Sequence, residues 1–145
     1  MTIRPVQNER DLERARAIRT RVFVEEQDCA PEEEWDGHDE TSRHVLGTVE
    51  GEAVATARWR AVSYEDKVVA KLERFAVLPA HRGQGYGQAL VRSVLVDVEQ
   101  AGFQRALIHA QSHLEEWYEQ FGFESTGRAF EEAGMPHVEM VRDAA

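Results

Sequence analysis

Hydrophobic residues recur every three or four positions in two stretches of the chain, which is the spacing of one face of a helix. The first stretch begins after Asn8, a residue that favours helix N-termini, and a less regular helical piece follows over Arg21–Gln27. The second stretch starts at Tyr86 and stops near Gly102, because glycine suits a helix C-terminus. A shorter helix is predicted over 112–121.

Short apolar runs bounded by turn residues predict strands. They are Thr2–Val6, two strands joined by a hairpin turn around Glu50-Gly51, Val68–Leu78 ended by Pro79, Arg105–Ala110, Phe123–Ser125 and His137–Val141. The acidic segment 28–42 carries Pro31 and Gly37 and predicts a loop. This order of elements predicts an α+β fold with a mixed sheet, since there are too few parallel repeats for a doubly wound fold.

Composition narrows the class of protein. The chain has 145 residues, 42% hydrophobic and 30% charged, which is typical of one soluble globular domain. A net charge of -10 disfavours nucleic acid and anionic membranes as partners. Cys29 is the only cysteine, so an internal disulfide is excluded and a reducing compartment is expected. No apolar run approaches membrane-spanning length, which predicts a cytoplasmic protein.

The segment VLPAHRGQGYGQAL, at 77–90, lies between a predicted strand and a predicted helix. Without Cβ atoms, Gly83, Gly85 and Gly87 let backbone N–H groups converge at the helix N-terminus, where a phosphate is favoured. Arg82 adds a positive charge. A dinucleotide fingerprint would require glycine where Gln88 stands, and a Walker loop would require a lysine. A plain structural turn is the alternative.

The pattern V-x-P-x-x-R-G-x-G-x-G resembles the acyl-CoA loop of the GNAT (Gcn5-related N-acetyltransferase) superfamily. Its marked positions are Val77, Pro79, Arg82, Gly83, Gly85 and Gly87. A second family signal is a helical tyrosine followed by Gly-Phe, matched here by Tyr118 and Gly122-Phe123. The stretches IRTRVFVEEQ and FEEAGMPHVEM resemble the ElaA-like branch, so the similarity covers nearly the whole chain.

The resemblance implies a single GNAT domain over 1–145, in α/β/α layers with a mixed central sheet of about seven strands and about four helices. It implies N-acetyl transfer from acetyl-CoA to a primary amine of a small molecule or peptide, by direct attack in a ternary complex. The acyl-CoA ligand would be bound by Phe75, Ala76, Val77, Arg82, Gly83, Gln84, Gly85, Tyr86, Gly87 and Gln111.

Tyr118 is the candidate general acid, because a phenol is matched in acidity to a leaving thiolate. Its alternative role is packing against neighbouring aromatic residues. Glu73 is the candidate base, directly or through water, although an ion pair with Arg74 is as plausible from the sequence. Tyr64, His109 and His137 are alternative proton relays.

In this family the acceptor pocket is built by the first helices and the loop after them, which implies Phe23, Glu26 and Trp35 as substrate-binding residues. A solvated acidic loop, with Trp35 covering the core, is the alternative. No metal is expected, since His109 and His113 fall on different elements. The final strands suggest a homodimer. A catalytically idle acyl-CoA sensor or interaction module is the competing function.

Overall fold

Seven strands form one sheet in the computed structural model, which describes residues 1–144 apart from the side chain of residue 33. They are β1 (Thr2–Pro5), β2 (Arg43–Val49), β3 (Glu52–Tyr64), β4 (Lys67–Val77), β5 (Arg105–Gln111), β6 (Glu124–Glu132) and β7 (Met135–Asp143). Their order is β1-β2-β3-β4-β5-β7-β6, and every neighbouring pair is antiparallel except β4 and β5. The predicted mixed sheet is confirmed.

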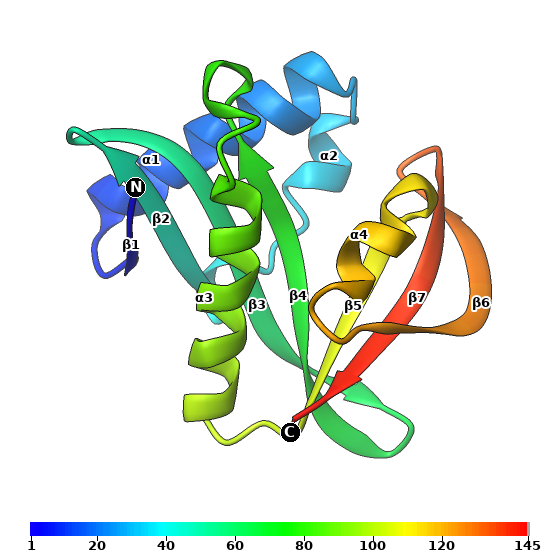
Figure 1. Ribbon diagram of the computed structural model, residues 1–145. Coiled ribbons are helices and arrows are strands. Elements are labelled where there is room, and N and C mark those ends of the chain that lie inside the picture. Colours follow the sequence, from blue (N-terminus) through cyan, green and yellow to red (C-terminus); the bar gives the residue numbers. More distant parts are fainter. Residues whose placement is uncertain (145) are drawn as a thin grey trace.

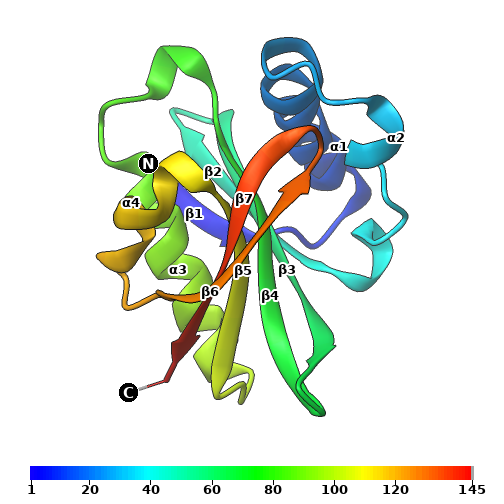
Figure 2. The same cartoon turned by 90° about the vertical axis from the view of Figure 1, so that its right-hand side faces the viewer.

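Helices cover both faces of this sheet (Figure 1). They are α1 (Glu9–Arg19), a π-helix over Thr20–Glu26 that continues it, α2 (Pro31–Glu34), α3 (Tyr86–Gln100) and α4 (Glu115–Glu119). Figure 2 shows α3 and α4 on one side of the sheet and α1 and α2 on the other, which confirms the three layers. The Asn8 side chain accepts a hydrogen bond from the Asp11 N–H at 2.8 Å and caps α1 as predicted.

Two predicted elements differ in extent. The segment 28–42 is not wholly loop, because it contains α2 and a 3-10 turn over Asp39–Thr41. The predicted helix over 112–121 is a 3-10 turn, Ser112–Leu114, followed by the short α4. No helix within residues 1–144 is long and apolar enough to cross a membrane.

The main core lies between α3 and the sheet. Leu90, Val91 and Val94 of α3 are fully buried against Trp59 and Leu72 and their neighbours. Burying each such side chain stabilises the fold by about 1.5–3 kcal/mol. A smaller apolar cluster, on the α1 face, consists of Ala15, Ile18, Val22, Leu46 and Ala76.

The last two strands are longer than the sequence predicted. β6 is an edge strand, and eight of its nine residues are exposed, so its sequence ESTGRAFEE shows no apolar alternation. Its pairing with β7, which includes Phe130 opposite His137, defines it instead. Hydrophobic patterning cannot detect a strand that buries neither face.

A β-bulge in β4 changes the face to which its side chains point. Near residue 57 the β3–β4 register shifts, so that one residue of β3 faces two of β4, Arg74 and Phe75. Arg74 adopts the left-handed region, with φ of 59°. Leu72, before the bulge, packs on the α3 face, whereas Ala76, four residues later, packs on the α1 face. A regular strand would place both on one face.

Candidate active site

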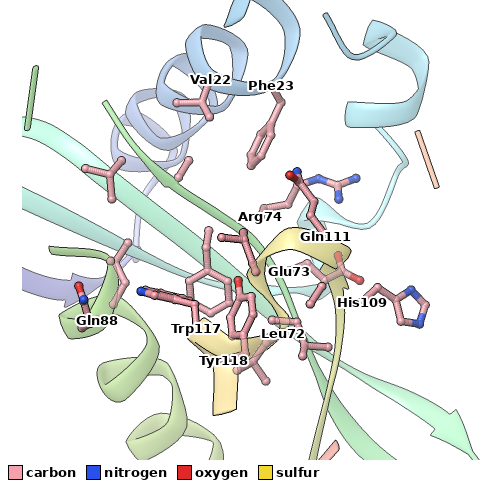
Figure 3. Close-up of a pocket in the computed structure, with 18 of the residues that line it drawn as sticks. Val22, Phe23, Leu72, Glu73, Arg74, Gln88, His109, Gln111, Trp117 and Tyr118 are labelled. Atoms are coloured by element: carbon pink, nitrogen blue, oxygen red, sulfur yellow. The ribbon is translucent and has the colours of Figure 1, made fainter. Parts of the chain in front are cut away.

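β4 and β5 separate toward the end of β4, and this opens the middle of the sheet. Their parallel pairing has three residue pairs and ends at Leu72 and Ile108. Beyond that point a cavity of about 720 Å³ lies between the two strands, the glycine loop, α4 and the π-helix. Figure 3 shows Tyr118 and Trp117 on one side of this cavity and Phe23 pointing toward it from the other.

Nearly all of the predicted cofactor-binding residues line the cavity. They are Phe75, Ala76, Val77, Arg82, Gly83, Gly85, Tyr86, Gly87 and Gln111. Gln84 is the exception: it is exposed at the tip of the loop. The topology therefore brings the end of β4, the loop after it and the end of β5 to one space.

The glycine loop has the backbone geometry that the sequence predicted. Gly83 and Gly85 have φ values of 80° and 81°, which residues with a Cβ rarely adopt. In the described chain no side chain caps α3, so the N–H groups of its first turn point toward the loop without a helical partner. This end of α3 can hold an anion.

Arg82 and Glu26 contact each other at the edge of the cavity. The Nη1 and Nη2 atoms of Arg82 lie 2.5 and 2.6 Å from the two Glu26 oxygens, and its Nε donates to the Val77 carbonyl at 3.0 Å. The hydrogen bond from Arg82 lowers the pKa of Glu26. Glu26, expected beside the substrate, therefore lies on the cofactor side of the site.

Tyr118 lies in the cavity wall and also packs in the core, so both roles expected from the sequence apply to it. The side chain is 6% exposed, and its ring makes edge contacts with Trp117 and Phe123 at centroid distances of 4.9 and 6.1 Å. Its hydroxyl points into the cavity (Figure 3). Burial raises the pKa of Tyr118, so the phenol keeps its proton at neutral pH.

Glu73 also lines the cavity, but three cations hold it. Arg58 Nε donates to Oε2 at 2.8 Å, Arg60 Nε donates to Oε1 at 2.9 Å, and Lys71 Nζ lies 3.5 Å from Oε1. Burial acts to raise the pKa of Glu73, but the charges of Arg58 and Lys71 outweigh it and lower the pKa. A carboxylate held in this way is a weak proton acceptor, so this geometry does not favour Glu73 as the base.

Arg74 contacts Glu34 and Asp36, and not Glu73 as in the alternative considered from the sequence. Arg74 Nε lies 2.9 Å from Glu34 Oε2, and its Nη2 donates to Asp36 at 3.3 Å. The bulge at Arg74 accounts for this, because a left-handed residue projects its side chain away from the regular strand direction.

The acidic segment is tied to buried arginines through some of its carboxylates, while most of its residues are exposed. Arg58, which has no exposed surface, donates to Asp36 Oδ2 at 2.6 Å and to Asp39 Oδ1 at 2.8 Å. Arg19, 1% exposed, donates to Asp39 at 2.7 Å. Sequence reasoning missed this cluster. The available signal was the alternation of charged residues in β3 and β4, which places Arg58, Arg60, Lys71 and Glu73 on one face.

Trp35 belongs to this cluster and not to the cavity wall. Its ring lies 5.0 Å from the guanidinium carbon of Arg19, a cation–π contact, and the side chain is 39% exposed. Phe23 is therefore the one predicted substrate-binding residue that lines the described cavity.

A second cavity of about 260 Å³ adjoins the first below the β6–β7 hairpin. Phe23, Gln27, Lys71, Glu73, Arg74, Gln111, Glu132 and His137 line both cavities. On this side His109 Nδ1 lies 3.0 Å from Glu132 Oε1. Among the side chains that the structure describes, no group of three or more His, Cys, Asp or Glu residues is arranged to hold a metal ion.

The family model described as "Acetyltransferase (GNAT) domain" matches residues 10–144. The chain belongs to the GNAT acetyltransferases. This is the family that the sequence motifs predicted, and its members are acyltransferases. The glycine loop, the separated strands and Tyr118 therefore belong to an acyltransferase.

Similar GNAT proteins cover nearly the whole chain. Protein ElaA of Escherichia coli K12 is 36% identical over 129 residues, which is 87% of this chain and 83% of ElaA. The crystal structure of E. coli ElaA superposes with a TM-score of 0.84 at 30% identity, over 98% of this chain and 99% of that one. These similarities confirm the ElaA-like branch.

Two further solved structures share the fold. An acyl-CoA N-acyltransferase from Pseudomonas aeruginosa has a TM-score of 0.86 at 27% identity, over 98% of this chain and 99% of that one. A GNAT acetyltransferase from Brucella melitensis, solved in complex with acetyl-CoA, has a TM-score of 0.77 at 16% identity, over 99% and 89% of the two chains.

Proposed function

We propose that this GNAT protein transfers an acetyl group from acetyl-CoA to a primary amine by direct attack in a ternary complex. The observation that carries the proposal is one continuous cavity that joins the glycine loop to Tyr118 through the gap between β4 and β5. Acetyl-CoA is also the ligand of the B. melitensis protein that shares this fold.

The ends of the cavity suit different parts of acetyl-CoA. The diphosphate would lie on the N–H groups of the Arg82–Gly87 loop and the first turn of α3, with Arg82 supplying charge. The pantetheine arm would run beside Phe75–Val77, at the edge of β4 that faces the gap. The backbone N–H of Val77 would then polarise the thioester carbonyl, an effect worth about 3 kcal/mol. The N–H of Ala76 points to β3, as that of Leu78 does.

Tyr118 would act as the general acid. The amine attacks the carbonyl carbon, the C–S bond breaks, and the departing sulfur takes the proton of the Tyr118 hydroxyl. Tyr118 keeps its proton throughout the neutral range, so its hydroxyl is available as a donor, although burial makes it a weaker acid than a free phenol.

One observation favours the competing function, an idle acyl-CoA sensor. Glu73, the candidate base from the sequence, is held by Arg58, Arg60 and Lys71. A protein that keeps the cofactor loop without a base would bind acyl-CoA and not turn it over.

Several wider features belong to the same proposal and are supported only by the sequence. They are a single domain, a cytoplasmic location, a small-molecule or peptide amine as acceptor, and a possible homodimer. No metal and no nucleic acid takes part in the proposed reaction.

Thermal melting and thiol release test the proposal. Acetyl-CoA and CoA should raise the melting temperature, whereas ATP at equal concentration should not; the reverse order would reject the acyltransferase assignment. Thiol release from acetyl-CoA is then measured over polyamines, amino sugars, amino acids and peptide N-termini. Release with one class supports the enzyme, and binding without release from any class supports the sensor.

A further inference from the structure

Three side chains from β5, β6 and β7 form a cluster on the side of the gap opposite the glycine loop. His109 Nδ1 lies 3.0 Å from Glu132 Oε1, and His137 Nε2 lies 3.9 Å from Glu132 Oε2. All three line the large cavity. His137 pairs across the strands with Gln111, three residues beyond the point where β4 and β5 separate. The cluster is therefore a wall of the gap.

Glu132 differs from the other carboxylates of the second cavity. Glu34, Asp36 and Glu73 each contact at least one arginine, as described above. Glu132 instead contacts the two imidazoles; the hydrogen bond from His109, with a smaller contribution from the charge of Lys71, lowers the pKa of Glu132. Glu132 is thus an ionised carboxylate, 43% exposed, that faces the acceptor side of the gap. An alkylammonium group is the complementary ligand.

The hydrogen bonds of His137 fix which ring nitrogen carries the proton. Nδ1 lies 2.8 Å from the Met135 carbonyl oxygen, and a carbonyl can only accept, so Nδ1 must be the donor. In the neutral ring, Nε2 then has a free lone pair. Phe130 stacks on the ring at a centroid distance of 6.0 Å and helps to fix its plane. Nε2 is the atom that faces Glu132.

The 3.9 Å between His137 Nε2 and Glu132 Oε2 is too long for a hydrogen bond. A single ammonium nitrogen can instead donate to both atoms at once. His109 occupies the other oxygen of Glu132 and leaves Oε2 directed toward this position.

We propose that Glu132 binds the ammonium group of the acceptor and that His137 Nε2 is the base that removes its proton. This inference rests on the proposed acetyl transfer. His109 is a positioning residue, because it acts through Glu132 and does not touch the amine. In this proposal His137 takes the role of base, for which Glu73 is poorly suited because three cations hold its carboxylate.

The proton steps balance. The ammonium gives one proton to His137, which passes it to solvent, and the neutral amine attacks the thioester carbon. The C–N bond forms, the C–S bond breaks, and the sulfur takes the Tyr118 proton. The nitrogen then gives up a second proton, which restores the Tyr118 hydroxyl by way of His137 and water. The products are the amide, CoA thiol and one free proton.

The charged groups that surround His137 come from three strands. Glu132 and His109 are closest to it, and Lys71, Glu73 and Arg74 line the same two cavities from β4. A base must be unprotonated before it can accept a proton, so activity should fall on the acid side.

The first test observes the imidazoles directly and requires no turnover. Protein with ¹⁵N-labelled histidine, saturated with CoA, is titrated with n-butylamine and followed by NMR. We expect His137 in the Nδ1–H tautomer, and we expect its Nε2 signal to move on titration. The shift should be lost in Glu132→Gln and retained in Glu131→Gln, the same charge change on the exposed neighbour. An Nε2–H tautomer, or no response to the amine, would overturn the inference.

The second test uses an amine found by thiol release. His137→Gln should lower kcat by about 10²–10⁴-fold and abolish the acid-side limb of the pH profile. His38→Gln, a change on the loop before β2, should retain the wild-type kcat and the acid-side limb of the pH profile. Acetyl-CoA should still raise the melting temperature of each variant. Unchanged turnover in His137→Gln would show that His137 is not the base, and the proposed acetyl transfer would still stand. Failure of the wild type to bind acetyl-CoA would reject the proposed function itself.

Discussion

Arg82 and Glu26 are joined by two parallel hydrogen bonds, one from each terminal nitrogen of the guanidinium to one oxygen of the carboxylate. Arg82 belongs to the loop after β4, and Glu26 ends the π-helix that continues α1. The pair therefore connects the first helical segment to the loop expected to hold a diphosphate. Both side chains are partly exposed, at 42% and 32%, so the pair is weak and can be exchanged for another anion.

Replacing Glu26 with glutamine should strengthen acetyl-CoA binding. The diphosphate competes with the Glu26 carboxylate for the same guanidinium, and exposed ion pairs of this kind are worth about 0.2–1 kcal/mol. We expect the dissociation constant of acetyl-CoA to fall by about two- to fivefold in isothermal titration calorimetry.

Glu25→Gln is the matched control, since it removes an equal charge from the exposed neighbouring position. Both variants lose the same long-range repulsion of the ligand, so only their difference reports on the contact with Arg82. Weaker binding in Glu26→Gln would mean that the carboxylate orients Arg82 for the ligand and does not compete with it.

Replacing Tyr118 with phenylalanine should slow turnover and spare binding. The variant keeps the ring that packs on Trp117 and loses only the hydroxyl that faces the cavity. Loss of a general acid costs about 10²–10⁴-fold in rate. Thiol release from acetyl-CoA measures kcat, and thermal melting with acetyl-CoA checks binding.

Tyr64→Phe serves as the comparison, because it removes a phenol hydroxyl that donates to Glu139 at 2.8 Å. Its turnover should stay close to that of the wild type. If Tyr118→Phe turns over as fast as Tyr64→Phe, Tyr118 takes no part in proton transfer.

The cofactor side of the site could be predicted from the sequence because it depends on backbone geometry. Gly83 and Gly85 are required by left-handed φ values, and a helix N-terminus follows them, so a local pattern is sufficient. The length of α3 was predicted for the same reason, since its apolar face repeats at the helical period.

The acceptor side could not be predicted in this way, because it depends on contacts between distant segments. Arg58 meets Asp36 and Asp39 only when the acidic segment folds over β3, and single-sequence patterns do not report such pairs. The bulge at Arg74 also left no mark, since the left-handed residue there is an arginine and not a glycine. Glu26 and Trp35 contact arginines, Arg82 and Arg19 respectively, and these contacts also join distant segments.

Replacing Arg58 with methionine should destabilise the fold strongly. The guanidinium is wholly buried and contacts Asp36, Asp39 and the buried Glu73, and these carboxylates would lose their central cation. Removing one partner of such a group costs about 3–5 kcal/mol. Urea denaturation measures the loss in the free energy of unfolding.

A double variant separates charge from packing. Adding Glu73→Gln to Arg58→Met removes one of the uncompensated carboxylates, so the pair should be less destabilised than the sum of the two single variants. Additive losses would show that the contribution of Arg58 comes from its volume and not from its ion pairs.

Acid should destabilise the protein through Asp36. Burial acts to raise its pKa, but the hydrogen bonds from Arg58 and from the His38 N–H, together with the charges of Arg58 and Arg74, outweigh burial and lower the pKa from 3.8 to about 2. A group whose folded pKa is depressed stabilises the fold above its unfolded pKa, and this stabilisation is lost as pH falls toward the folded pKa. Melting temperature should therefore drop between pH 4 and pH 2 with a contribution from Asp36.

In Asp36→Asn this contribution is absent, so the gap in melting temperature between wild type and variant should narrow as pH falls through that window. Asp66→Asn, a matched change in the exposed turn before β4, controls for the general effect of removing one negative charge. A gap between Asp36→Asn and the wild type that stays constant from pH 5 to pH 2 would contradict the ion pair with Arg58 as the cause.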